Sequence, residues 1–270
     1  MSTIPRANFE DPLLAERSRR RMELFRTRML TPWVVALLLI GAIAGGVALH
    51  PAVAPVVVVL AMAITWYFAD SKARAEWWVL LVHHLGMELD VCTIDGLTPL
   101  LRSGDEREVL RAASDGRRRL LVFRSTDVSR DSKGNESKTH HDYTCVQLKD
   151  AAPAIRFLSA HEHRVGWAKW LGDDLRGRTI GGVDEFKVES VDLHEKFELR
   201  SSTVDGERAR MIFSPSFILW FTRQGVAFEY EGGDLLVIVD RVLEHAEEYK
   251  VLLARADEIH TAIARVGPTS

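Results

Sequence analysis

The sequence predicts an α+β protein with an N-terminal two-helix transmembrane hairpin and one mixed, mainly antiparallel sheet domain that ends in an amphipathic helix. Three observations support this fold class. Residues 32–69 contain no Asp, Glu, Lys or Arg. Short segments with strand-like alternation, separated by Gly and Asp turns, fill the middle of the chain. Apolar residues then recur at helical spacing from Val242 until Gly267. We therefore expect a basic amphipathic helix over 1–31, the hairpin over 32–70 and a cytoplasmic α+β domain over 71–270.

The first region has the pattern of a basic helix that begins at Asp11 and Pro12, a residue pair typical of an N-cap and a first helical position. Its polar positions are largely arginine: Arg17, Arg19, Arg20, Arg21, Arg26 and Arg28. Such a helix beside a membrane would contact anionic lipid headgroups. The alternative is a solvated helix whose charges only determine membrane topology.

The uncharged stretch divides into two apolar halves, 33–49 and 52–69, each about long enough to cross a hydrocarbon core of roughly 30 Å. We assign to the hairpin its interfacial aromatic residues, its closely packing glycines and its turn residues: Trp33, Gly41, Gly45, His50, Pro51, Pro55, Trp66 and Tyr67. A cleaved signal peptide is the competing interpretation, but Ala52-Val53-Ala54 is followed by proline, a poor cleavage context. The Arg-rich flank predicts an inner (plasma) membrane protein with two spans and both termini in the cytoplasm.

The remaining sequence predicts alternating helices and strands. Expected helices cover 71–89, 106–113, 205–213, 216–223 and a C-terminal segment from Val242. Expected strands cover 120–123, 143–148, 154–158, 186–191, 197–202, 226–230 and 235–239. Residues 129–139, with Gly134-Asn135, form the clearest hairpin connection. No element is assigned to 165–182.

Charge and cysteine content narrow the possible functions. Residues 70–270 carry 28 Lys and Arg against 34 Asp and Glu, which argues against nucleic acid as a partner. Cys92 and Cys145 are isolated, without the spacing of a metal site, and are expected to be buried, inert thiols. No nucleophile elbow or phosphate-binding loop is present, so neither catalytic residues nor a cofactor are predicted.

A metal site is the main chemical alternative. His161 and His163 would share one face of a strand, and Cys145 or His141 are further possible donors. No HExxH or CxxC motif accompanies them. Ordinary surface histidines near the ends of strands are the simpler explanation.

Residues 189–217 carry a resemblance to a known family. Glu189, Phe197, Asp205, Ala209 and Pro215 follow its motif. The chain resembles a family of uncharacterised bacterial, actinobacterial-type membrane proteins with an N-terminal transmembrane hairpin and a cytoplasmic domain of unknown function. The resemblance implies a fold and a topology, but no activity.

Parts of the motif differ, and its residues also have structural explanations. Val191 replaces an acid, His194 an asparagine and Glu195 a basic residue, so polar contacts built on these positions are in doubt. Phe197 is expected to face a core from a strand. Asp205 would cap the next helix by accepting from the backbone N–H of Glu207 or Arg208, and Pro215 would begin the helix after it.

Together these patterns predict a membrane-anchored interaction or scaffold module without catalytic activity. Its expected partners are the lipid bilayer, anionic lipid through the Arg-rich helix, and an unknown protein partner or a second copy of the chain. The alternative is a membrane-tethered metal-binding sensor or hydrolase that uses the region of His161 and His163.

Overall fold

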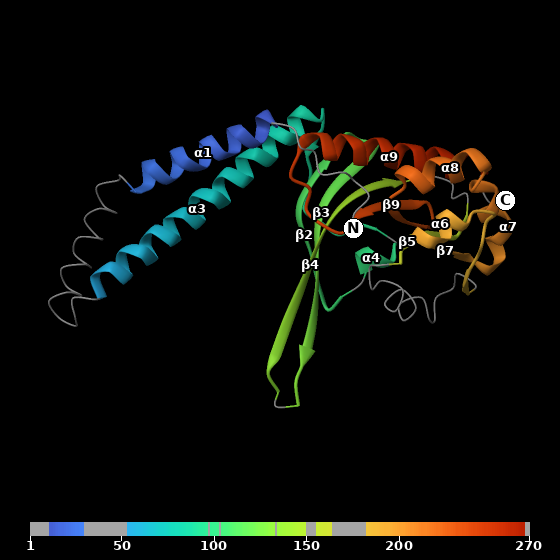
Figure 1. Cartoon of the computed structure of the whole chain (residues 1–270), viewed down its shortest axis with the longest axis horizontal. Helices are drawn as coiled ribbons and strands as arrows, with labels where there is room; N and C mark the ends of the chain where they lie inside the picture. The colour runs from blue at the N-terminus through green and yellow to red at the C-terminus, as the bar shows by residue number, and fades with distance from the viewer. Residues whose placement is uncertain are drawn as a thin grey trace. The chain divides into compact units, whose positions relative to one another are not determined.

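The computed structural model describes residues 11–29, 53–96, 98–102, 104–132, 134–149, 155–163 and 182–267. The chain divides into two compact units (Figure 1). One is Asn8–Leu85, and the other is Gly86–Ser270 together with Met1–Ala7.

The first unit contains two helices, α1 (Pro12–Met29) and α3 (Val53–His84). Helix α1 begins where the sequence predicts, because Asp11 Oδ1 accepts a hydrogen bond of 2.8 Å from the backbone N–H of Leu13. Helix α3 continues through Ala69 into the segment that was expected to be helical over 71–89, and it ends at His84.

Ion pairs join α1 to α3. Asp70, which is only 8% exposed, lies beside Arg21 at 3.3 Å and accepts a hydrogen bond of 2.7 Å from Nε of Arg74. Burial alone would raise the pKa of Asp70, but the hydrogen bonds and charges of Arg74, Arg21 and Arg17 outweigh burial and lower this pKa. Arg20 Nε donates to Glu76 at 2.7 Å. Several arginines of α1 therefore bind carboxylates of α3.

No helix among the described residues is long and apolar enough to cross a membrane. The described apolar part of α3 ends at Ala69 and is shorter than the roughly twenty residues that a span requires. Charged residues then follow within the same helix: Asp70, Lys72, Arg74 and Glu76. This finding overturns the predicted transmembrane hairpin, and with it the assignments as a membrane protein and to a two-span position in the inner membrane.

The residues assigned to that hairpin are distributed as follows. Trp33, Gly41, Gly45, His50 and Pro51 lie outside the described residues. Pro55, Trp66 and Tyr67 are part of α3. The ring of Trp66 packs edge-on against Phe25 of α1 with centroids 5.3 Å apart, and the guanidinium of Arg21 lies 4.8 Å from the Trp66 ring centroid.

The described residues of the second unit form a nine-stranded sheet with the order β1-β2-β3-β4-β9-β8-β5-β7-β6, in which every neighbouring pair is antiparallel. The strands are β1 (Glu88–Leu89), β2 (Glu106–Ser114), β3 (Arg118–Arg130), β4 (Glu136–Lys149), β5 (Phe157–Glu162), β6 (Val183–Glu185), β7 (Phe197–Ser202), β8 (Ala227–Glu231) and β9 (Asp234–Val239). The predicted α+β class with a mainly antiparallel sheet agrees with this architecture.

Helices cover both faces of the sheet. They are α4 (Pro99–Arg102), α6 (Val191–Lys196), η1 (Thr203–Asp205), α7 (Gly206–Ile212), α8 (Pro215–Gln224) and α9 (Ala246–Ala264). Helix α9 crosses the sheet at β4 and β9 (Figure 1). Successive side chains of a strand point to opposite faces. Val146 of β4 therefore points away from the face on which its neighbour Cys145 packs beneath α4.

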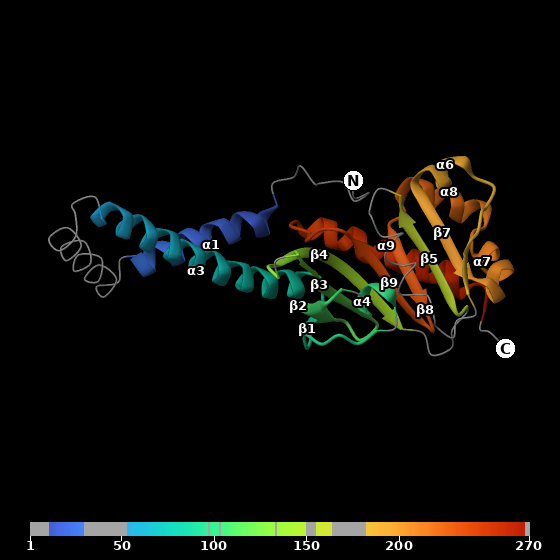
Figure 2. The ribbon, with the colours of Figure 1, turned by 90° about the horizontal axis from the view of Figure 1, so that it is seen from below.

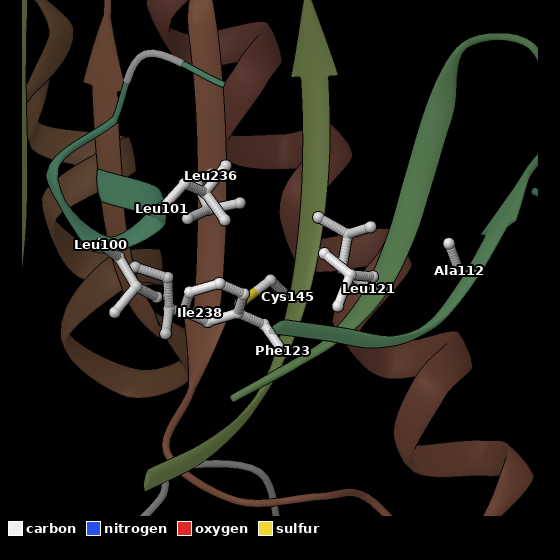
Figure 3. Packing of buried hydrophobic residues seen from close by; sticks show 9 residues of the cluster. Leu100, Leu101, Ala112, Leu121, Phe123, Cys145, Leu236 and Ile238 are labelled. Atoms are coloured by element: carbon white, nitrogen blue, oxygen red, sulfur yellow. The ribbon is translucent and has the colours of Figure 1, made fainter. Parts of the chain in front are cut away.

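The core beneath α4 is a buried cluster in which Leu100 and Leu101 of the helix pack against the strands (Figure 3). The other members come from β2, β3, β4 and β9: Val109, Ala112, Leu121, Phe123, Cys145, Leu236 and Ile238. The buried Cys145 was expected, and burial followed by the charge of Glu229 raises the pKa of its thiol well above the usual value. Cys92, in contrast, is exposed.

Most predicted elements are present, including β7, the β8–β9 hairpin, α7, α8 and α9, and the β3–β4 hairpin connection. In the sheet unit, two segments adopt a different secondary structure from the one predicted. Residues 106–113 form the strand β2 rather than a helix, because they pair with β3 through a register shift between Val109 and Arg111. Residues 186–191 form a loop into α6 rather than a strand, because Ser190 caps that helix by accepting from the backbone N–H of Leu193 at 3.3 Å. The predicted strand over 154–158 begins later, at Phe157. The unassigned segment 165–182 lies outside the described residues except for its last residue.

Candidate binding groove between α6 and α8

A groove of about 1030 Å³ lies on the second unit. Residues of the loop before α6 and of α6 itself form one wall: Lys187, Val188, Glu189, Ser190, Asp192, Glu195 and Lys196. Residues of α7, α8 and the turn between them form the other: Arg210, Phe213, Pro215, Ile218, Leu219, Thr222 and Arg223. Figure 2 shows α6, α7 and α8 gathered beside β5 and β7.

Local contacts fix the first wall. Leu193 is fully buried and anchors α6. The backbone N–H of Val188 donates to His194 Nε2 at 3.0 Å, so this histidine holds the preceding loop against the helix.

The second wall is held by an aromatic cluster under α8. Pro215 is the first residue of that helix, and Ser214 Oγ accepts from the backbone N–H of Phe217 at 3.5 Å. The ring of Phe221 packs against Phe197 of β7, with centroids 4.8 Å apart, and edge-on against Phe228 of β8 at 5.7 Å. Phe197, from the resemblance motif, therefore lies in the core that supports this wall.

The motif residues Asp205 and Ala209 lie behind the groove rather than in it. Asp205 is at the N-cap position of α7, but its carboxylate makes no capping hydrogen bond. It accepts instead from the backbone N–H of Arg156 at 2.8 Å. Ala209 is fully buried on α7. Glu189 is the motif residue that contributes an exposed charge to the groove.

The groove combines an apolar floor with exposed charges. Phe213 is buried, whereas Leu219 is 55% exposed. Among the described residues, none of the exposed carboxylates and guanidiniums that line the walls forms an ion pair: Glu189, Asp192, Glu195, Arg210 and Arg223. Elsewhere in this unit exposed or half-buried charges are commonly paired, as in Arg124–Asp142 at 2.6 Å and Arg119–Asp90 at 2.7 Å. Lys196 Nζ donates to the backbone carbonyl of Thr222 at 2.8 Å and joins the two walls.

The predicted metal ligands have different environments. His161 is buried on β5, with Nε2 at 3.5 Å from Glu229 Oε1, whereas His163 is exposed in the turn after β5, with Nε2 at 2.7 Å from the backbone carbonyl of His194. Cys145 lies beneath α4, and His141 on β4 lies 3.5 Å from Asp127. Within the described ranges, no three His, Cys, Asp or Glu side chains are arranged to hold a metal ion.

The buried acid beside His161 was not predicted from the sequence. Glu229 is fully buried, and its Oε2 accepts from the backbone N–H of Leu100 at the start of α4 at 2.8 Å. Burial, and then the charge of Arg200, lowers the pKa of His161 to about 3. Glu229 Oε1 lies 3.5 Å from His161 Nε2, but burial of the ring is the largest cause of this shift. An acid inside the strand segment Ala-Phe-Glu-Tyr-Glu was the available sequence signal.

Comparisons with known proteins identify no family. No protein-family model matches the sequence. No curated protein matches it either. A distant structural neighbour is the mycobacterial, and hence actinobacterial, trehalose monomycolate transport factor A, whose crystal structure superposes with a TM-score of 0.47 at 9% identity. The match covers 71% of this chain and 95% of the neighbour. A likeness this weak does not establish a shared fold or a shared activity.

Proposed function

We propose that this protein is a non-catalytic binding module that holds a segment of a protein partner in the groove between α6 and α8. The observation that carries the proposal is an apolar floor flanked by charged side chains that form no ion pair with other described residues. Burial of the exposed Leu219 by a partner would contribute roughly 25 cal/mol for each Å² of apolar surface removed from water. The charges at the rim would then contribute specificity and faster association.

The form of the groove favours a peptide segment over a small molecule. Its volume of about 1030 Å³ lies at the upper limit of typical small-molecule sites, and many of its lining residues are exposed. Small-molecule sites enclose most of the ligand surface. An open trough between two helices is instead the geometry in which grooves receive an amphipathic helix.

Both hydroxyl side chains of the groove lining form hydrogen bonds within their own helices: Thr222 Oγ1 donates to the backbone carbonyl of Ile218 at 2.8 Å, and Ser190 caps α6. Ser190 Oγ accepts the capping hydrogen bond of α6 from Leu193, and a nucleophilic serine needs a neighbouring general base. Among the described residues that line the groove there is no histidine that could act as that base.

Site-specific photo-crosslinking in cells of the source organism tests the proposal. A photoreactive amino acid at Leu219, in the groove, should crosslink one defined partner. The same group at Val204, which is 59% exposed but outside the groove lining, should not. Leu219→Asp should remove the partner from a co-purification, whereas Val204→Asp should retain it. Equal crosslinking from both positions, or retention of the partner by Leu219→Asp, would contradict the proposal.

A further inference from the structure

The charges of the groove are separated by wall. The wall formed by α6 and its preceding loop carries three carboxylates, those of Glu189, Asp192 and Glu195, besides Lys187. The wall formed by α7 and α8 carries Arg210 and Arg223. Lys196 belongs to α6, but its ammonium group lies against the backbone carbonyl of Thr222 on α8. The α6 wall is therefore mainly acidic, and the α8 wall is basic.

The two walls do not neutralise each other. Among the described residues, no ion pair joins Glu189, Asp192 or Glu195 to Arg210 or Arg223. Opposite charges in contact across a narrow cleft would gain Coulomb energy by pairing. Their separation leaves space above the apolar floor, and each wall presents one sign of charge to whatever occupies it.

We propose, building on the binding function above, that the occupant is an amphipathic helix of a partner protein whose apolar stripe is flanked by basic residues on one side and acidic residues on the other. The apolar stripe packs on Ile218 and Leu219, beside the buried Phe213. The basic flank faces the carboxylates of the α6 wall, and the acidic flank faces the cations of the α8 wall. A helix whose two flanks carry the same charge is attracted by one wall and repelled by the other.

This arrangement also fixes the direction of the bound helix. Turning a helix end over end, with its apolar stripe still on the floor, exchanges its two flanks. Only one direction therefore matches both walls. The groove selects the partner by its charge pattern and also determines which way the helix runs.

Synthetic amphipathic helices of about twenty residues test the inference. All have the same leucine stripe: the mixed helix has lysine on one flank and glutamate on the other, and two uniform helices have only lysine or only glutamate. Fluorescence anisotropy with the full chain at low salt should show the mixed helix binding about tenfold more tightly than either uniform helix, because several exposed pairs change from repulsive to attractive. The preference should weaken as salt is added.

Charge reversal supplies matched variants. Arg210→Glu with Arg223→Glu makes both walls acidic, so the preference should change to the all-lysine helix. Adding Glu189→Lys, Asp192→Lys and Glu195→Lys exchanges the two walls and should restore the preference for the mixed helix. A photoreactive group at the N-terminus of the peptide should then crosslink to the opposite end of the groove. All five side chains are exposed, so thermal unfolding should show that each variant is folded.

The outcomes separate this inference from the proposed function. Equal affinities for the three helices, all abolished by Leu219→Asp, would overturn the charge selection and leave the binding groove intact. Binding of none of the helices, or binding that survives Leu219→Asp, would overturn both. If the variant with exchanged walls again prefers the mixed helix, but the peptide N-terminus crosslinks to the same end of the groove as in the wild type, the groove does not determine the direction of the helix.

Discussion

Buried polar residues in this chain occupy strand positions that would ordinarily hold apolar side chains. Glu229 lies between Phe228 and Tyr230 on β8 and is fully buried. It accepts from the first turn of α4 and lies beside His161. Burial of a polar side chain is costly unless hydrogen bonds compensate, so this residue connects the sheet to α4 through a specific contact rather than through packing alone.

His161 should make the protein less stable in acid. Its pKa is about 3 when folded and 6.5 when unfolded, so between these values the unfolded state binds a proton that the folded state excludes. The free energy of unfolding therefore falls as the pH drops below about 6.5. His161→Leu should reduce this slope by up to about 1.4 kcal/mol per pH unit. Urea unfolding between about pH 4.5 and 7.5 measures the slope.

The exposed His163 supplies the matched variant, His163→Leu, which also replaces one imidazole by leucine but does so at the protein surface. Both variants retain the carboxylates that also titrate in this range, so the comparison isolates the buried ring. Identical slopes for wild type and His161→Leu would show that the folded protein accepts the proton on His161.

Asp205 illustrates what local spacing can and cannot predict. An Asp just before a helical segment is typical of an N-cap, and Asp205 does stand at the N-cap position of α7. Its carboxylate nevertheless accepts from Arg156, which is distant in sequence. A local pattern gives the position of the helix start, whereas the partner of the side chain depends on which distant segment the fold brings beside it.

At the scale of elements, alternation and turn residues predict the sheet best where both signals coincide. The β8–β9 hairpin has apolar strands around Gly232-Gly233, and these glycines adopt φ values of 60° and 93°, which favour glycine. Strand β2 was missed because residues 106–113 lack alternation, and their pairing with β3 involves a register shift. Non-local pairing there overrides the local pattern.

The outer part of the β3–β4 hairpin should be dispensable for folding. Pairing of β2 with β3 ends at Thr126, and pairing of β9 with β4 ends at Thr144, so beyond these residues β3 and β4 pair with each other and with no further described strand (Figure 1). Replacing 129–137 by Asn-Gly, which favours a tight hairpin turn, removes the exposed Arg130–Glu136 pair and little apolar surface. The free energy of unfolding should change by less than about 1 kcal/mol.

Chemical unfolding monitored by circular dichroism measures this change. Leu121→Ala, in the buried part of the same β3 strand, is the contrasting variant and should cost about 2–5 kcal/mol. A loss of comparable size on shortening the hairpin would mean that its outer part supports the core.

At the scale of the whole molecule, the composition of the N-terminal region led to a wrong prediction. A long uncharged stretch predicted a transmembrane hairpin, whereas α3 passes without interruption from apolar residues into a charged segment. Asp70 and Glu76 in that segment bind arginines of α1, so the pattern that was interpreted as a lipid-facing basic helix includes charges used for helix pairing. The helical unit ends at Leu85, and the next residue, Gly86, has a φ of 69°.

Only some of the residues that line the groove could be identified from the sequence. Residues 189–217 were singled out by their motif, and Glu189 and Pro215 do line the groove. The separation of charge between its walls could not be predicted, because it depends on α6 packing beside α8 rather than on spacing along either helix. Exposed charges at Asp192 and Arg223 would be unremarkable on isolated helices.

Residues 86–270 should fold and bind without the helical unit. Their core is formed within the unit, by the cluster beneath α4 and by the aromatic cluster under α8, and both groove walls belong to it. A fragment of these residues should unfold cooperatively and bind the mixed-flank helix with a Kd within about twofold of the full chain, as expected for independent sites. Leu219→Asp in the fragment is the control and should abolish binding. A fragment that folds but has lost affinity would show that residues 1–85 contribute to the groove, whereas one that fails to unfold cooperatively would show that the second unit needs the first to fold.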